Sequence, residues 1–441
     1  MRDGSGSRTS AGGLAPDIGP TRALSIGIGG IVGGGFFATF GLAIVAARGA
    51  TWLSFLVGGV VALLTAYSYV RLTLRYPGPS GTAGFVRLGF GSGVLPASIN
   101  VLLILSYIAI MAIYARALGA YSVSHVAPAD REIWTRILAS AAILLLGVIN
   151  FAGAGLMQRF ETAFNVGKLA ALAVFVVGGL LLGHPDWSRA GPAYWVPIAT
   201  VISSGMVVFL SYEGFELISN VSKRIRNPER TLPIALYGSV GAAILIYVLS
   251  VVVAVGHLPF EAVEEAKSFA LSAVAAQFLG AFGFGLMTIG AVAASASAIN
   301  ADFFGAEKLP TMLGEHGELP RFFTRTIKGR ALWSLVAIGA LALLAVNLID
   351  LHALSAAASG GFLIVYAAVN VANTRLARET GSQAWISIAA GVACVAALAI
   401  MLGQFLSSPE TRHSAYVVAG MAALSVVFEL ASRLTRSPRA S

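Results

Sequence analysis

Several ionisable side chains lie inside long apolar stretches of this sequence, where a charge is costly. Lys168 lies in the apolar run at 162–183, and Glu213 and Glu216 lie in the run at 195–220. An ionised group inside a bilayer costs on the order of a few kcal/mol, so such residues normally face a cavity. These side chains are therefore the first candidates for binding an ion, a proton or a polar solute.

The first apolar run, 23–46, contains the glycine-rich sequence Gly27-Ile-Gly-Gly-Ile-Val-Gly-Gly-Gly-Phe-Phe37. Glycine at this density disfavours a continuous helix, although backbone groups in a bilayer must be hydrogen-bonded internally. Where a membrane helix unwinds beside a cavity, its freed amides and carbonyls bind small solutes, helped by the partial charges of the half-helix ends. The sequence therefore predicts a substrate site made mostly of main chain. Close helix packing is the alternative role of these glycines.

A second interruption lies between Ser203 and Asn220, where Glu213, Gly214 and Glu216 occur in an otherwise apolar helix. The two interrupted runs are the first and the sixth. Each therefore opens a block of five spans, which is the spacing of a five-plus-five inverted repeat. In such a repeat the two broken helices meet near the middle of the membrane.

The elements that position these residues follow from composition. Hydrophobic residues make up 57% of the 441 residues and charged residues 11%, which excludes a water-soluble globule. We predict an all-α integral membrane protein with twelve transmembrane helices. The expected spans are 23–46, 52–74, 94–121, 135–152, 162–183, 195–220, 233–256, 280–304, 331–349, 353–373, 384–405 and 414–434. The expected units are a disordered cytoplasmic tail (1–20), two five-helix repeats (21–184 and 195–375), two peripheral helices (384–434) and a cytoplasmic tail (435–441).

Basic residues set the expected orientation, because they favour cytoplasmic loops. With both termini inside, most of the 29 lysines and arginines fall in inner segments. Seven fall in outer loops, namely Arg48, Arg116, Arg131, Arg136, Arg189, Lys267 and Arg412. The net charge of +9 is thus a topology signal and predicts no nucleic-acid partner. The expected location is a cell (inner) membrane, with the lipid bilayer as a partner.

Catalytic and metal sites are not expected. The six histidines fall in predicted loops without the close spacing of metal ligands. The one cysteine, Cys394, lies in an apolar run and has no partner for a disulfide. We therefore expect no enzyme activity, no metal and no cofactor.

Several motifs together resemble the amino acid, polyamine and organocation permease superfamily. They are Gly27-x-Gly29-x-x-x-Gly33-x-Gly35-Phe-Phe37, Ser211-Tyr-Glu-Gly-Phe-Glu216, Arg226-Asn-Pro-Glu-Arg230 with Leu232-Pro233, Asn300, and Gly314-Glu-His-Gly-Glu-Leu-Pro320. The resemblance extends from about residue 20 to 375. It implies the five-plus-five fold shared with sodium-coupled leucine transporters, with broken first and sixth helices and two peripheral helices.

The resemblance also implies a substrate site at the first break, after Gly33. Amides of Gly34 and Gly35 would hold a substrate carboxylate, and the carbonyl of Ile31 would hold its ammonium group. The helix-dipole argument predicts the same polarity. The candidate walls of the pocket are Leu210 and Tyr212 at the second break and Tyr107, with Met111, on the third span. Packing is the alternative role of these wall residues.

Lys168 is the candidate coupling residue. From the sequence alone, this lysine either extends to the headgroups or serves a function inside the membrane. The stretch Asn165-Val-Gly-Lys-Leu-Ala resembles the fifth span of proton-coupled permeases, in which a lysine amine replaces a sodium ion. Ser295 and Ser297 would approach this amine, or instead bond back to their own helix.

Two roles are open for each of the remaining charged candidates. Glu216 matches a family glutamate implicated in pH response, or it is a structural acceptor at helix ends. Glu213 departs from the motif, where an apolar residue is usual, and is either a cation ligand or structural. An inner gate of ion pairs is a further hypothesis, with headgroup anchoring as the alternative. It would combine Arg224, Arg226 and Arg230 with Asp302, Glu307 and Lys308.

Together these features predict a secondary active transporter that moves an amino acid or related amine by alternating access, through proton symport. The alternatives are an amino acid/polyamine exchanger, sodium coupling, and a transport-inactive solute sensor. The expected partners are the small-molecule substrate and protons. A second copy of the chain, in a homodimer, is a further candidate partner.

Overall fold

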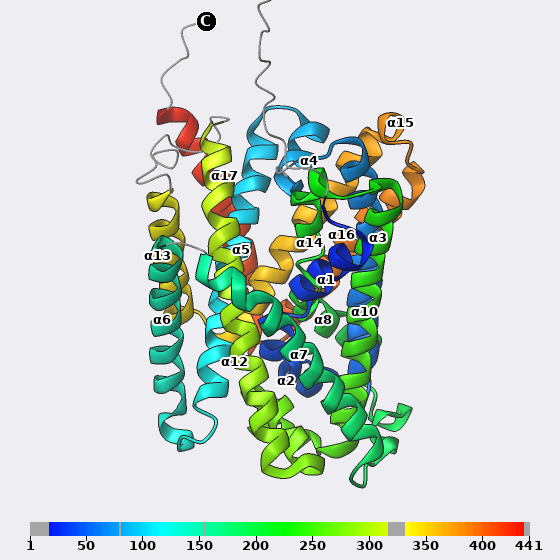
Figure 1. Cartoon of the computed structure of the whole chain (residues 1–441), viewed down its shortest axis with the longest axis vertical. Coiled ribbons are helices and arrows are strands. Elements are labelled where there is room, and N and C mark those ends of the chain that lie inside the picture. The colour runs from blue at the N-terminus through cyan, green and yellow to red at the C-terminus, as the bar shows by residue number, and fades with distance from the viewer. Residues whose placement is uncertain (1–16, 79–80, 153–154, 316–330, 436–441) are drawn as a thin grey trace, which may run out of the picture.

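The computed structural model describes residues 17–78, 81–152, 155–315 and 331–435, and these residues form helices joined by short loops (Figure 1). The first half contains α1 (Pro20–Ile31), α2 (Gly34–Ala47), α3 (Thr51–Arg75), α4 (Gly81–Phe90), α5 (Val94–Ser122), α6 (Pro128–Ala152), α7 (Gly155–Leu181), η1 (Trp187–Ala190) and η2 (Pro192–Tyr194). The second half contains α8 (Ile198–Val207), η3 (Phe209–Tyr212), α9 (Leu217–Asn220), η4 (Ser222–Arg224), α10 (Pro228–His257), α11 (Phe260–Glu265), η5 (Lys267–Phe269), α12 (Ala270–Glu315), α13 (Leu332–Leu348), α14 (Leu351–Arg375), α15 (Ala377–Thr380), α16 (Ala384–Ser407) and α17 (Arg412–Thr435).

Within the described residues, nine helices are long and apolar enough to cross a membrane, and up to eleven spans result if each of two bent pairs counts as one. The prediction of an all-α, multi-pass membrane protein is confirmed. The count of twelve spans stays a prediction, because α13, with 17 residues, is shorter than the roughly 20 residues of a typical span. The two inverted repeats also stay a prediction.

The two bent pairs lie where the sequence predicts interruptions. α1 and α2 form one pair, bent by 49°, and Val32 and Gly33 separate them. α8 and the segment Phe209–Asn220 form the other pair, bent by 54°. In the second break the backbone of Gly214 has φ +113°, a conformation that side chains other than hydrogen strongly disfavour.

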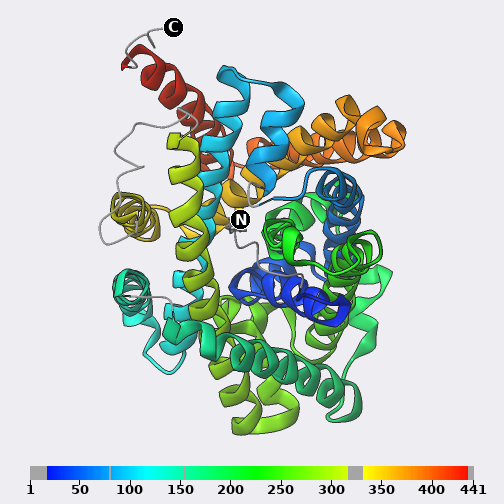
Figure 2. The same ribbon diagram turned by 45° about the horizontal axis from the view of Figure 1, so that its top comes forward.

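These broken helices lie in the middle of the bundle. α1 packs on α10, and α2 packs on α5, α8 and α12. Figures 1 and 2 show the short helices α1, α2 and α8 surrounded by the long helices α3, α5, α7, α10 and α12. Of the helices predicted as peripheral, α16 packs on α14, α8 and α3, and α17 packs on α14 and α5.

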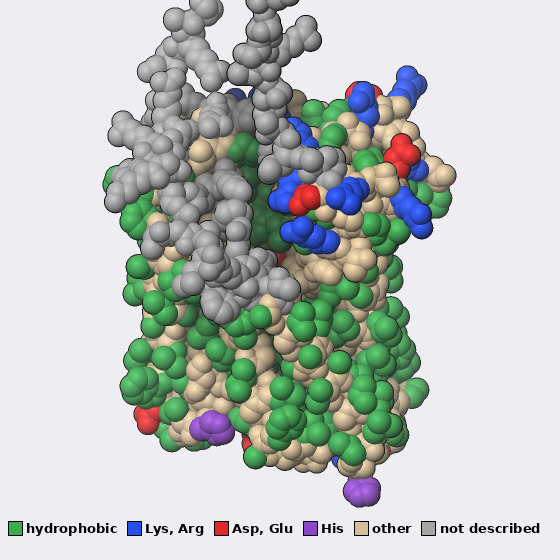
Figure 3. Space-filling model, in the orientation of Figure 1, with side chains coloured by type: hydrophobic (Ala, Val, Ile, Leu, Met, Phe, Trp, Pro, Cys, Tyr) green, Lys and Arg blue, Asp and Glu red, His purple; other side chains and the backbone are tan. Residues whose placement is uncertain are grey.

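One end of the bundle carries many basic side chains, which Figure 3 shows at its top in blue. Hydrogen bonds join segments at this end: Tyr76 to Glu379, Gly78 to Ser222, Arg375 to Gly89, and Arg224 to Asp17. We call this end the basic face. Its other arginines and lysines include Arg75, Lys223, Arg226, Arg230 and Arg378. On the face that Figure 3 shows, the surface between the two ends carries many hydrophobic and few charged side chains, as expected for contact with lipid.

The structure also contains elements that the sequence did not predict. α4 lies between α3 and α5 at the basic face and packs on α14 and α5. α12 is 46 residues long and begins ten residues before the predicted span at 280. It bends at Gly280, whose φ is +59°.

Candidate functional site

The two breaks lie directly against each other. A Cβ atom placed on Gly214 would lie 2.6 Å from the carbonyl carbon of Gly30, and one on Gly30 would lie 2.9 Å from the carbonyl oxygen of Gly214. No side chain fits between these two backbones. The predicted meeting of the first and sixth helices is therefore a backbone contact, which explains why glycine is needed on both sides.

The first break leaves main-chain groups without partners inside the helix. Gly33, the residue before α2, provides no side-chain cap. The first amides of α2, among them those of Gly34 and Gly35, therefore lack intrahelical acceptors, and the positive end of the α2 dipole lies at the same place. Such a helix end attracts anionic groups, including carboxylates.

Tyr247, on α10, joins the two breaks. Its hydroxyl lies 3.0 Å from the carbonyl oxygen of Ile31 and 2.9 Å from that of Ser211. A hydroxyl has one proton, so it donates to one of these carbonyls at a time. The Ile31 carbonyl assigned to the substrate ammonium is thus shared with a tyrosine. The sequence analysis missed Tyr247, although a tyrosine in an apolar span signals a hydroxyl that needs a partner.

Glu216 organises the second break. Its carboxylate accepts the backbone N–H of Gly214 at 2.9 Å, the hydroxyl of Tyr366 at 3.0 Å and the hydroxyl of Tyr107 at 3.3 Å. Glu216 is 2% exposed. Glu216 therefore accepts hydrogen bonds from three donors, and Tyr107 lies beside the second break.

Leu210 and Tyr212 differ in where their side chains lie. The Leu210 side chain faces the start of α2, because a Cβ atom on Gly35 would lie 2.7 Å from its Cδ1 atom. The Tyr212 hydroxyl donates to the carbonyl of Phe55 on α3 at 2.7 Å. Leu210 therefore lies against the first break, whereas Tyr212 anchors the second break to α3. Met111 is fully buried on α5.

Lys168 reaches the first broken helix. Its side chain is 3% exposed, and its amine donates a 2.7 Å hydrogen bond to the carbonyl of Gly29. The neighbouring Asn165 also touches this turn, since a Cβ atom on Gly29 would lie 2.7 Å from its amide nitrogen. In this structure the Lys168 side chain is directed to α1 and does not extend to the lipid headgroups. The amine instead binds the backbone one turn before the break.

The two candidate serines on α12 have different surroundings. Ser295 faces the break: its hydroxyl would lie 2.9 Å from a Cβ atom on Gly34, and the oxygen is buried with no hydrogen-bond partner. Ser297 is two residues further on and half-buried. Two residues turn a helix by about 200°, so the two side chains point in different directions. Ser295 is therefore the α12 hydroxyl at the first break.

Glu213 is 5% exposed and interacts with Tyr114 of α5 and with Glu216. It also lies close enough to Asp302 of α12 for the two charges to interact. One carboxylate oxygen of Asp302 is buried without a hydrogen-bond partner. The space beside the breaks is thus acidic on the side of Glu213. Among the described residues no group of three or more His, Cys, Asp or Glu side chains could hold a metal ion.

One residue of the predicted inner gate, Arg224, has a partner outside the predicted set. Arg224 pairs with Asp17 through two hydrogen bonds, of 2.9 and 2.6 Å, and not with Asp302. The Asp17 pKa is lowered, first by this hydrogen bond and then by the Arg224 charge. The side chains of Glu307 and Lys308 lie outside the described residues, as does most of the Gly314–Pro320 motif. The ion pair therefore ties the start of α1 to the end of the second broken helix.

Comparison with known proteins identifies the family. A model of the amino acid permease family matches residues 18–428. The chain is 30% identical to the inner membrane transport protein YbaT of Escherichia coli, over 82% of this chain and 84% of that protein. It is 28% identical to an uncharacterized protein of Methanocaldococcus jannaschii, over 87% of both chains.

It is also 26% identical to the chloroplastic cationic amino acid transporter 9 of Arabidopsis thaliana, over 72% of this chain and 58% of that protein. The family and the named transporters among these relatives are permeases and not enzymes. The residues that the family model matches include both broken helices, Lys168 and the acidic side chains described above. The chain belongs to the amino acid permease family of membrane transporters.

Proposed function

We propose that this chain is a secondary active transporter that moves an amino acid or related amine by alternating access, coupled to protons through Lys168. The observation that carries the coupling is the 2.7 Å contact between the Lys168 amine and the Gly29 carbonyl. Lys168 is buried, and the contact lies one turn before the break at which the substrate would bind. The amine therefore occupies a place from which its charge acts on α1.

The physical basis is the strength of a charge-assisted hydrogen bond. A protonated amine holds the Gly29 carbonyl more strongly than a neutral amine does. Coupling further requires that Lys168 release this proton in each transport cycle. Loss of the proton would weaken the hold on α1 and favour the conformation in which the substrate site opens to the other side of the membrane. Proton binding and helix position are in this way linked.

The substrate is held by the main chain in this proposal. The amides at the start of α2 bind the carboxylate, and the carbonyl of Ile31 binds the ammonium group. The Ile31 carbonyl accepts the backbone N–H of Gly33 at 2.7 Å and the Tyr247 hydroxyl at 3.0 Å. When Tyr247 turns its hydroxyl to the Ser211 carbonyl, the second acceptor position of Ile31 becomes open to the substrate. Ser295 adds an unpartnered hydroxyl beside Gly34.

Exchange of an amino acid for a polyamine or a second amino acid is the other candidate. Glu213 and Asp302 favour it, since two neighbouring carboxylates would bind a second amine. The proton symporter differs from the exchanger in needing no substrate on the far side. The two are therefore separable by experiment.

The test is uptake of each of the twenty labelled amino acids by proteoliposomes, with and without an inward proton gradient, in sodium-free and in sodium buffer. We expect proton-driven, sodium-independent uptake that Lys168→Ala abolishes while exchange without a gradient continues. Lys223→Ala is the matched control, because Lys223 is an exposed lysine at the basic face. It should behave like the unmodified protein.

Other outcomes overturn parts of the proposal. Accumulation only in vesicles preloaded with substrate indicates an exchanger. Uptake that requires sodium and persists in Lys168→Ala assigns coupling to sodium. Binding without movement under any condition indicates a solute sensor.

A further inference from the structure

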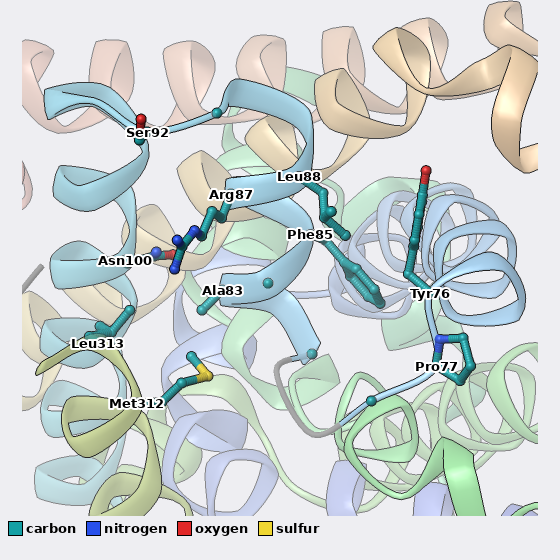
Figure 4. Close-up of a pocket in the computed structure, with 14 residues that line it drawn as sticks. Tyr76, Pro77, Ala83, Phe85, Arg87, Leu88, Ser92, Asn100, Met312 and Leu313 are labelled. Carbon is teal, nitrogen blue, oxygen red and sulfur yellow. The ribbon is translucent and has the colours of Figure 1, made fainter. Parts of the chain in front are cut away.

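A cavity of about 700 Å³ lies at the basic face, apart from the two breaks. Its walls come from the end of α3, from α4, from the start of α5 and from the last turns of α12 (Figure 4). Phe85 and Leu88 of α4 and Met312 and Leu313 of α12 make much of its apolar lining. The cavity is larger than an amino acid, so a bound solute would keep some of its water.

Arg87 gives this cavity its charge. Among the described residues that line it, Arg87 is the only charged side chain. The Nη1 atom of Arg87 is buried and has no hydrogen-bond partner. Arg87 and Asn100 both line the cavity, and Figure 4 shows the Arg87 guanidinium directed from α4 toward Asn100 on α5. A guanidinium carries five donors in a planar fork that suits a carboxylate, so an anion is the ligand that this group lacks.

The cavity lies on the same helices as the substrate site. Asn100 is seven residues before Tyr107 on α5, which corresponds to about 10 Å, and Met312 is ten residues after Asp302 on α12, about 15 Å. In both cases the displacement is toward the basic face. A solute that leaves the breaks along α5 and α12 therefore meets Arg87 next.

We propose that Arg87 forms a second substrate site, which binds the carboxylate of the transported solute between the breaks and the basic face. The identity of the ligand rests on the proposed function, because a carboxylate held first by the amides of α2 would need another positive partner on its way out. Arg87 would bind an anionic group, and a lipid phosphate is the other ligand that could supply one. Arg87 would thus set a requirement for a free carboxylate on the substrate.

The charge of the cavity can be tested without transport. In a Cys394→Ser background, Met312→Cys provides one thiol on the cavity wall. Its rate of reaction with an anionic and with a cationic methanethiosulfonate reagent is measured in detergent. We expect Arg87→Gln to lower the anionic-to-cationic rate ratio several-fold. Arg71→Gln, which makes the same change on α3 outside the cavity lining, should leave the ratio unchanged, and Arg87→Lys should largely restore it.

The ligand is tested with the same thiol. Leucine and arginine should slow its modification, whereas leucinol and argininol, which lack the carboxylate, should not, and Arg87→Gln should remove the protection. An unchanged rate ratio in Arg87→Gln, or no protection by either amino acid, overturns the proposal. Protection only in liposomes that contain phosphatidylglycerol also overturns it, in favour of a lipid phosphate. Protection by amino acids without any vesicle uptake would leave this site standing while the transport proposal fails.

Discussion

Gly30 and Gly214 lie in direct backbone contact at the point where both broken helices are interrupted. The residues are 184 positions apart, yet a Cβ atom on Gly214 would lie 2.6 Å from the Gly30 carbonyl carbon and 2.9 Å from the Ile31 nitrogen. The contact holds the two breaks at one level of the bundle. It therefore brings the start of α2 close to the second break, where the Leu210 side chain lies against Gly35.

Gly214→Ala should remove transport and lower stability. The added methyl group meets backbone atoms that have no room to move, and the φ of +113° adds strain of roughly 1–3 kcal/mol. Thermal unfolding in detergent and uptake by vesicles measure the two effects. Gly167→Ala on α7 is the control, because a Cβ atom there meets nothing within 4 Å. Equal behaviour of the two variants would show that the contact does not matter.

Tyr247→Phe should lower the KM for the substrate, because the substrate ammonium no longer competes with a hydroxyl for the Ile31 carbonyl, and it should lower stability slightly. The variant keeps the ring, which stacks on Phe36 at 4.1 Å, but it leaves the carbonyls of Ile31 and Ser211 without this donor, at a cost of about 1 kcal/mol. Tyr212→Phe also loses one hydroxyl contact, to Phe55, away from the Ile31 carbonyl. A decrease in KM confined to Tyr247→Phe supports the shared carbonyl, and matching KM changes in both variants contradict it.

Glu216→Gln should lower the free energy of unfolding by roughly 1–3 kcal/mol. Glu216 accepts from Gly214, Tyr366 and Tyr107, and an amide would turn one of its acceptors into a donor that faces a donor. Chemical denaturation in mild detergent measures the loss. Glu229→Gln, at an exposed position near the start of α10, is the control. A loss no larger than in that control would mean that Glu216 is not an essential acceptor.

Asp17→Asn should change how stability depends on pH. Because the Asp17 pKa is held below its ordinary value of 3.8 by Arg224, the ionised carboxylate stabilises the folded state. This contribution is full well above the ordinary carboxyl pKa and is lost as the pH falls through the lower pKa of the folded protein. The melting temperatures of the two proteins should differ at neutral pH and converge in acid. A constant difference across this range would rule out the ion pair, and added salt should reduce the difference at neutral pH.

The sequence determined the features that depend on local composition. Apolar runs long enough to cross a bilayer predicted the helices, because a spanning segment must satisfy its own backbone and bury no charge. Dense glycine between Gly27 and Gly35 predicted the first break. Gly214 between two glutamates predicted the second. Lys168 stood out because a lysine inside an apolar run is costly.

The tertiary structure decided which of these groups meet, since partners distant along the chain follow no local pattern. It paired Lys168 with the carbonyl of Gly29 and Arg224 with the carboxylate of Asp17. The hydrophobic periodicity of the sequence indicates neither pairing. The tertiary structure brought Tyr247 between the two breaks, although this residue is one of several tyrosines in apolar spans. It also placed Arg87 in a cavity, because a short helix between two spans has an environment that only packing defines.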